Sequence, residues 1–112
     1  MPEQGEIVLI PVPFTDLSST KRRPFIVISN RAYHQTTSDM VVVAMTSNPA
    51  QAPYSFPITS SDLQRGTLNR PGMVRVDKIY TLSQALIVRT FGKVNELILE
   101  QIRQLLQQLT TT

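Results

Sequence analysis

The segment Thr15-Asp-Leu-Ser-Ser-Thr-Lys-Arg-Arg-Pro24 lies between two short runs of strand-forming residues, Glu6-Ile-Val-Leu-Ile10 and Phe25-Ile-Val-Ile-Ser29. The first run is β-branched and apolar on both faces, which predicts a well-covered strand, and the second run predicts another. Between them, three consecutive cations lie on a small, polar segment that is predicted to be a flexible loop. Its proline fixes φ where the second strand begins. Cations displayed in this way can meet a phosphate.

Four further runs of the sequence predict strands. They are Met40–Met45, Tyr54–Thr59, Met73–Asp77 and Ala85–Thr90. Pro57 cannot donate a hydrogen bond to a sheet, so the strand that contains it is expected at an edge. For the same reason, Pro11 and Pro13 are expected to end regular pairing after the first strand. The polar residues 30–39 show no periodicity and are expected to form a loop.

The C-terminal part of the sequence predicts one amphipathic α-helix. Asn95 can accept hydrogen bonds from the free amides of the first turn. Apolar residues then recur on one helical face, at Ile98, Ile102, Leu105, Leu106 and Leu109. Together with the strands before it, this helix predicts a mainly β fold of one domain, residues 1–112, built as a small, strongly bent antiparallel sheet or barrel.

Composition argues against several classes of function. The chain has no cysteine and a single histidine, His34, so it offers no thiolate metal site, no multi-histidine metal site and no pair of imidazoles for a ribonuclease. His34 itself is expected on the surface. No apolar run approaches the roughly 20 residues of a membrane span, and the first residues do not resemble a signal peptide. We therefore expect a cytoplasmic protein that uses no cofactor, and its net charge of +3 suits an anionic partner.

The chemistry that remains is cationic. Clustering Lys21, Arg22 and Arg23 incurs mutual repulsion that an anion would relieve. Thr46 and Ser47 add hydroxyl groups after a central strand, where they could instead satisfy only the turn backbone. A guanidinium can hold two phosphate oxygens and stabilise the charge of a pentacoordinate state. Because RNA supplies its own 2′-hydroxyl nucleophile, an arginine and a threonine lying together could cleave it without a metal ion.

Seven short motifs, in this order, resemble the MazF/PemK family of toxins from type II toxin–antitoxin systems. The motifs are residues 5–10, 13–17, 21–24, 25–29, 44–47, 74–79 and 92–94. The resemblance implies a small SH3-like barrel with a C-terminal helix that works as a homodimer. It also implies a metal-independent endoribonuclease that cuts single-stranded RNA at short sequences, leaves a 2′,3′-cyclic phosphate and a 5′-hydroxyl, and is neutralised by a cognate antitoxin.

The resemblance also implies roles for individual residues. The arginine directly before the proline, Arg23, would act as general acid/base or charge stabiliser, and Thr46 would support the scissile phosphate. Arg22 is a rival for the catalytic role. The other predicted RNA contacts are Thr20, Lys21, Arg22, Ser47, Arg75, Asp77 and Lys78. The rest of the segment 15–24 is expected to form a flap over the RNA.

A second reading belongs to a different class of function. Gyrase poisons of the CcdB type share this barrel and act by protein contact, so the fold alone does not decide between the two. A non-catalytic relative that only binds RNA is the other form of this alternative. The Arg23-Pro24 and Thr46-Ser47 pairs favour the ribonuclease, because a gyrase poison has no need to retain them.

Overall fold

A computed structural model of the chain describes residues 1–13 and 20–112. Within these residues, seven antiparallel strands form one sheet in the order β4-β6-β3-β2-β1-β7-β5. The strands are β1 (Glu6–Pro13), β2 (Thr20–Val27), β3 (Asp39–Thr46), β4 (Ser55–Ile58), β5 (Leu63–Gly66), β6 (Gly72–Ser83) and β7 (Arg89–Val94). The helices are α1 (Arg31–Thr36) and α2 (Glu96–Thr110), with 3₁₀ turns at Ser60–Asp62 and Gln84–Leu86.

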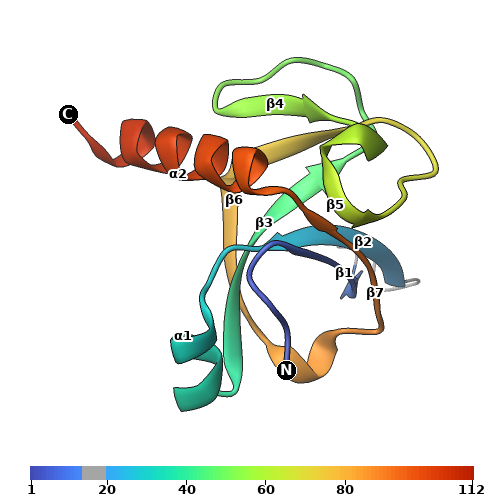
Figure 1. Ribbon diagram of the computed structural model, residues 1–112, viewed down its shortest axis with the longest axis vertical. Helices are drawn as coiled ribbons and strands as arrows, with labels where there is room; N and C mark the ends of the chain where they lie inside the picture. Colours follow the sequence, from blue (N-terminus) through green and yellow to red (C-terminus); the bar gives the residue numbers. More distant parts are fainter. Residues whose placement is uncertain (14–19) are drawn as a thin grey trace.

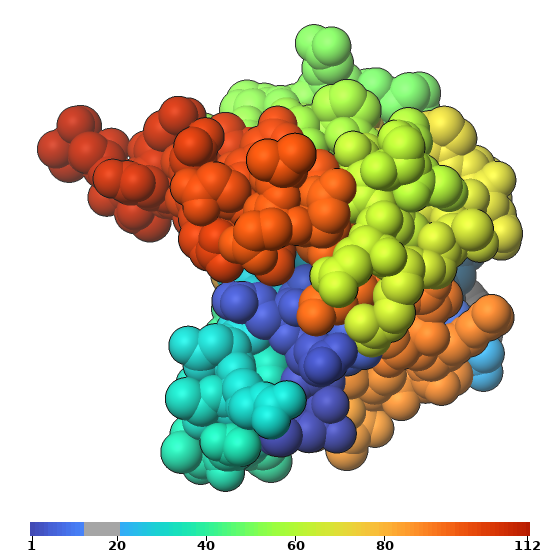
Figure 2. All heavy atoms as spheres, viewed as in Figure 1, coloured from blue at the N-terminus to red at the C-terminus, as the bar shows by residue number. Residues whose placement is uncertain are grey.

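The sheet curls on itself, and the two helices lie at different ends of it. Figure 1 shows α2 lying beside the upper part of β6, while α1 lies near the lower end of β3. The outer end of α2 projects from the body of the molecule (Figure 2). No helix in the described part of the chain is both long and apolar enough to cross a membrane.

Alternation along the central strands builds two apolar cores, one on each face of the sheet. On β1 and β2, Ile7 and Ile26 pack into the core beneath α2, whereas Val8 and Phe25 pack into the core on the other face. Successive side chains of a strand point to opposite faces, so two buried faces require the continuous apolar runs seen in the sequence. The central strands are therefore covered on both sides.

Helix α2 begins and packs as its sequence predicts. The Asn95 side chain accepts a hydrogen bond of 3.0 Å from the Ile98 amide, which caps the first turn. Ile98, Leu99 and Ile102 are buried against the sheet. A fully buried isoleucine truncated to alanine typically costs about 2–5 kcal/mol, so Ile102 is the side chain on which docking of this helix depends most.

The prediction that Pro11 and Pro13 end the pairing of the first strand is wrong, since β1 pairs with β2 through Pro13. Strand β1 pairs with β7 only from Glu6 to Leu9. The Leu9 carbonyl accepts from the Val88 amide, on the β7 side. Pro11 and Pro13 lie two and four residues after Leu9, so their backbone nitrogens face the same side. Strand β7 no longer pairs with β1 at these positions. The prolines therefore interrupt no hydrogen bond.

Three other boundary predictions need correction. Lys21–Arg23 lie on strand β2 and not in a loop. Residues 30–39 contain helix α1, which Asn30 caps by accepting from the Tyr33 amide. The last strand is β7 at Arg89–Val94, because a 3₁₀ turn occupies Gln84–Leu86. Pro57, as predicted, lies on an edge strand, β4. The predicted flap falls largely on residues 14–19, which lie outside the described residues.

His34 is buried, at 4% exposure, so its predicted surface position is also wrong. Helix α1 turns it toward β3, where its Nε2 lies 2.6 Å from the Ser29 hydroxyl oxygen. That hydroxyl also accepts from the Val41 amide at 2.9 Å. The histidine therefore links α1 to the sheet and has a structural partner.

Candidate active site

A cleft opens where strands β2 and β3 separate. Their pairing ends at Phe25 and Ala44. The next residue of β2 is Pro24, whose amide position faces β3 but carries no hydrogen to donate. The Arg-Pro pair thus ends the ladder and opens the space beyond it. The cleft has a volume of about 550 Å³ and is lined by Leu9, Arg23, Pro24, Met45, Thr46, Ser47, residues 66–72, Arg89 and Phe91.

Arg23 and Thr46 reach this cleft from neighbouring strands. Phe25 lies opposite Ala44 in the β2–β3 ladder, so the same register carried two residues further sets Arg23 opposite Thr46. Residues two apart on a strand share a face of the sheet. Both predicted catalytic residues therefore continue the face that carries Phe25 and Ala44, at the mouth of the cleft.

Within the described residues, the Thr46 hydroxyl takes part in a hydrogen bond that shapes the neighbouring turn. Its oxygen accepts from the Asn48 amide at 3.1 Å, which shapes the turn after β3. This is the turn-satisfying role that the sequence left open for the hydroxyls at this position. A hydroxyl that accepts in this way keeps its own hydrogen to donate. Thr46 is half-buried and Ser47 is exposed, and both line the cleft.

Two lining residues, Arg70 and Arg89, were not among the predicted site residues. Arg70 lies in the connection between β5 and β6, and Arg89 begins β7, opposite Leu9 of β1. The sequence shows only a turn signal at Arg70-Pro-Gly72 and an isolated cation at residue 89. Their approach to the cleft depends on β7 pairing with both β1 and β5, which no local pattern encodes.

The other cations of β2 lie outside the lining. Lys21 and Arg22 are both exposed. Because adjacent residues of a strand point to opposite faces, Arg22 projects away from the face that carries Arg23. Thr20 is the first residue of β2, and its side chain lies outside the described part of the structure.

Arg75, Asp77 and Lys78 also lie outside the cleft lining. They lie where β6 bulges, since Arg75 is opposite Ala44 while Val43 is opposite Ile79. Arg75 binds Asp77 through two hydrogen bonds of 3.0 and 3.1 Å. The hydrogen bonds from Arg75 hold the pKa of the Asp77 carboxyl below its usual value. Contact of these three residues with RNA stays a prediction.

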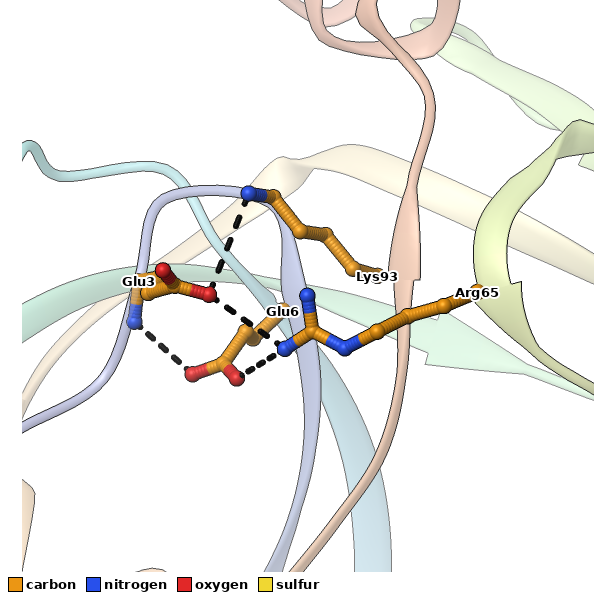
Figure 3. Close-up of polar contacts among 4 residues, drawn as sticks. All are labelled: Glu3, Glu6, Arg65 and Lys93. Carbon is orange, nitrogen blue, oxygen red and sulfur yellow. Dashed lines mark hydrogen bonds and ion pairs between the residues drawn. The ribbon is translucent and has the colours of Figure 1, made fainter.

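The wall of the cleft opposite β2 and β3 is anchored by an ion cluster (Figure 3). Arg65 of β5 binds Glu6 of β1 at 2.7 Å and Glu3 at 3.3 Å, and Lys93 of β7 lies 3.8 Å from Glu3. Figure 2 shows the N-terminal segment, β5 and β7 packed together at this point. We call these four residues the N-terminal clasp. No group of three or more histidine, aspartate or glutamate residues arranged to hold a metal occurs within residues 1–13 and 20–112.

Comparisons with known proteins agree with this architecture. A family model described as PemK-like, MazF-like toxin of type II toxin–antitoxin system matches residues 3–110. Among solved structures, the chain is similar to an endoribonuclease in complex with its cognate antitoxin from Mycobacterial species, with a TM-score of 0.78, 22% identity, and 96% of this chain and 93% of that chain covered. A comparison with curated proteins found no match.

Two other solved structures have the same fold. The MazE–MazF complex (Form-III) from Deinococcus radiodurans matches with a TM-score of 0.75, 20% identity, and 99% of this chain and 98% of that chain covered. The Mycobacterium tuberculosis toxin MazF-mt6 matches with a TM-score of 0.68, 15% identity, and 90% and 93% coverage. At such identities the likeness establishes the fold alone. The predicted mainly β barrel with a C-terminal helix is confirmed.

Proposed function

Because the chain belongs to the PemK-like, MazF-like toxin family of type II toxin–antitoxin systems, we propose that it is a sequence-selective endoribonuclease. Its substrate is single-stranded RNA, messenger RNA in particular, which it cleaves in the cytoplasm. The products are a 2′,3′-cyclic phosphate and a 5′-hydroxyl, and the reaction needs no metal ion. Two of the similar solved structures are described as endoribonucleases, which supports this class of activity.

One observation carries the proposal: Arg23 and Thr46 line the same cleft, on the same face of neighbouring strands. Arg70 and Arg89 line it too, and none of the described lining residues is acidic. Three guanidinium groups, with no carboxylate among the described lining residues, give this cleft a positive potential that attracts a phosphodiester. It also offers the hydroxyls of Thr46 and Ser47 as hydrogen-bond donors.

The chemistry follows from these groups. The RNA 2′-oxygen attacks the adjacent phosphorus, the bond from phosphorus to the 5′-oxygen breaks, and the proton lost by the 2′-hydroxyl is balanced by one gained by the leaving 5′-oxygen. Arg23 binds the non-bridging oxygens and stabilises the charge that builds up in the pentacoordinate state. The Thr46 hydroxyl donates to the same phosphate. Because the nucleophile belongs to the substrate, no activated water is required.

The proposal includes two protein partners. The first is a cognate antitoxin with an acidic binding segment, which suits a chain of net charge +3; similar solved structures contain a cognate antitoxin or MazE. The second is another copy of the chain. Large apolar side chains on β6 and in residues 86–88 are between 41% and 47% exposed, and a dimer would cover them; they are Ile79, Tyr80, Leu86 and Val88. Light scattering of the purified chain measures the dimer directly.

The activity is tested by incubating purified protein with a mixed RNA pool in EDTA and mapping the ends of the fragments. Cleavage at a short recurring sequence, with 2′,3′-cyclic phosphate ends, is the expected result. Intact RNA across the pool would contradict the nuclease. Expression in cells then separates the alternatives, because trapped DNA breaks would indicate a gyrase poison, while RNA binding without cleavage would indicate an inactive relative.

A further inference from the structure

The cleft has two walls with different origins in the chain. Arg23 and Thr46 stand on one wall, at the ends of β2 and β3. Arg70 and Arg89 stand on the other, which is made from the connection between β5 and β6 and from the start of β7. We infer that this second wall is an additional anion-binding site, in which Arg70 and Arg89 hold a phosphate next to the scissile one. The inference rests on the proposed function.

The charges of the second wall are available to a ligand. Arg65, Arg75 and Arg103 each form an ion pair with a carboxylate. Arg70 and Arg89 are exposed, and neither has an ion pair with any other residue in the described ranges. Two guanidinium groups with no carboxylate partner in those ranges, on one wall of one cleft, repel each other until an anion lies between them.

The backbone that leads to Arg70 is held at two points before it. Gly66 adopts φ +87°, and a Cβ there would lie 2.4 Å from the Phe91 carbonyl oxygen. Only glycine lets β5 approach β7 this closely. Further along, the Ser60 hydroxyl accepts from the Leu68 amide at 2.8 Å and donates to the Leu68 carbonyl at 3.2 Å. Arg70 therefore follows a connection whose path is fixed two residues earlier.

Arg89 is held by the sheet itself. It lies opposite Leu9, the last residue of β1 that pairs with β7. Leu9 in turn lies opposite Pro24 of β2. Cross-strand partners share a face of a sheet, so Arg89, Leu9 and Pro24 form a row on one face, and all three line the cleft. The row sets Arg89 two strands away from Pro24 and from its chain neighbour Arg23.

The two walls are expected to do different work. A group that touches only a neighbouring phosphate binds the ground state and the transition state alike, so its loss raises KM and leaves kcat largely unchanged. Arg23, which touches the reacting phosphate, should affect kcat. Phosphate contacts also carry no sequence information, so the second wall should contribute equally to all RNA sequences.

The test is the salt dependence of RNA binding. A short degenerate pool of 2′-O-methyl RNA lacks the free 2′-hydroxyl, so it binds without being cut. Fluorescence anisotropy with this pool gives the slope of log Kobs against log salt concentration for the wild type and for Arg70→Gln, Arg89→Gln and the double variant. Each lost contact should reduce the steepness of the slope by about 0.7, and the double variant by about 1.4.

Arg31→Gln is the matched control, because it removes the same charge from an exposed arginine on α1, outside the cleft. The inference is overturned if Arg70→Gln and Arg89→Gln give the same slope as Arg31→Gln. Wild-type cleavage of ordinary RNA reports on the proposed nuclease separately. Reduced slopes without any cleavage would support the anion-binding site and contradict the proposed nuclease. Cleavage with unchanged slopes would support the nuclease and contradict the anion-binding site. Circular dichroism melting curves establish that each variant is folded.

Discussion

Glu6 Oε2 lies 2.7 Å from Arg65 Nη2, which ties the first residue of β1 to the edge strand β5 across β7 (Figure 3). Glu6 is only 12% exposed at its side chain, and its other oxygen accepts from the Glu3 amide at 2.8 Å. A nearly buried carboxylate needs such partners, because removing them leaves an uncompensated charge. The N-terminal clasp therefore supports the strand that leads into the second wall of the cleft.

Replacing Glu6 by glutamine should destabilise the fold. The amide keeps the size of the side chain but loses the charge-assisted bond to Arg65, so the free energy of unfolding should fall by about 1–2 kcal/mol. Urea denaturation measures the change. Glu96→Gln is the control, because Glu96 also binds an arginine, Arg103, but is 77% exposed; its cost should stay within about 0.5 kcal/mol. Equal losses in the two variants would contradict a structural role for the clasp.

Ser29→Ala should also lower stability, for a different reason. It removes the hydroxyl that accepts from the Val41 amide and contacts the buried His34 ring. The buried His34 ring and the partly buried Val41 amide would each lose a partner, which predicts a loss of about 1–3 kcal/mol. Thermal unfolding checks this, with Ser38→Ala, at an exposed serine, as the comparison. If Ser29→Ala and Ser38→Ala have the same melting temperature, the link between α1 and the sheet contributes nothing to stability.

The Arg75–Asp77 pair predicts a dependence of stability on pH. Hydrogen bonds from Arg75 lower the pKa of Asp77 in the folded state. The charged carboxylate thus stabilises the fold above the unfolded-state pKa of about 4, and this contribution is lost as the pH falls through the lower folded-state pKa. Asp77→Asn should reduce the loss of stability between neutral and acidic pH, measured by urea denaturation at each pH. The prediction is contradicted if the free energy of unfolding of Asp77→Asn falls toward acidic pH as steeply as that of the wild type.

Thr46 is predicted to act through its hydroxyl. Thr46→Val keeps the shape but removes both the donor to the phosphate and the acceptor for the Asn48 amide, so the cleavage rate should fall by about 100-fold. Thr46→Ser retains the hydroxyl and should recover most of the rate. Single-turnover cleavage measures both variants. If serine fails to rescue, the methyl group and not the hydroxyl is what the site requires.

Local patterns predicted the α2 cap at Asn95 and the edge position of Pro57. The choice of Arg23 and Thr46 came from the family resemblance, and both residues line the cleft. Local patterns did not predict that Pro11 would lie within a ladder, because that depends on where β7 stops pairing with β1. Burial of His34 was missed because a short helix, capped by Asn30, turns it toward β3. Arg70 and Arg89 were missed for a similar reason. They join the site through strand pairings between distant parts of the chain, and a single sequence does not display those pairings.

The most direct test of the central claim compares two adjacent residues of one strand. Arg22 and Arg23 are both exposed, carry the same charge and project to opposite faces of β2, and only Arg23 lines the cleft. Cleavage of RNA in EDTA should fall by about 100-fold or more in Arg23→Gln, and by less than about tenfold in Arg22→Gln, which loses at most a phosphate contact. Equal rates in the two variants, or a greater loss in Arg22→Gln, would contradict the account.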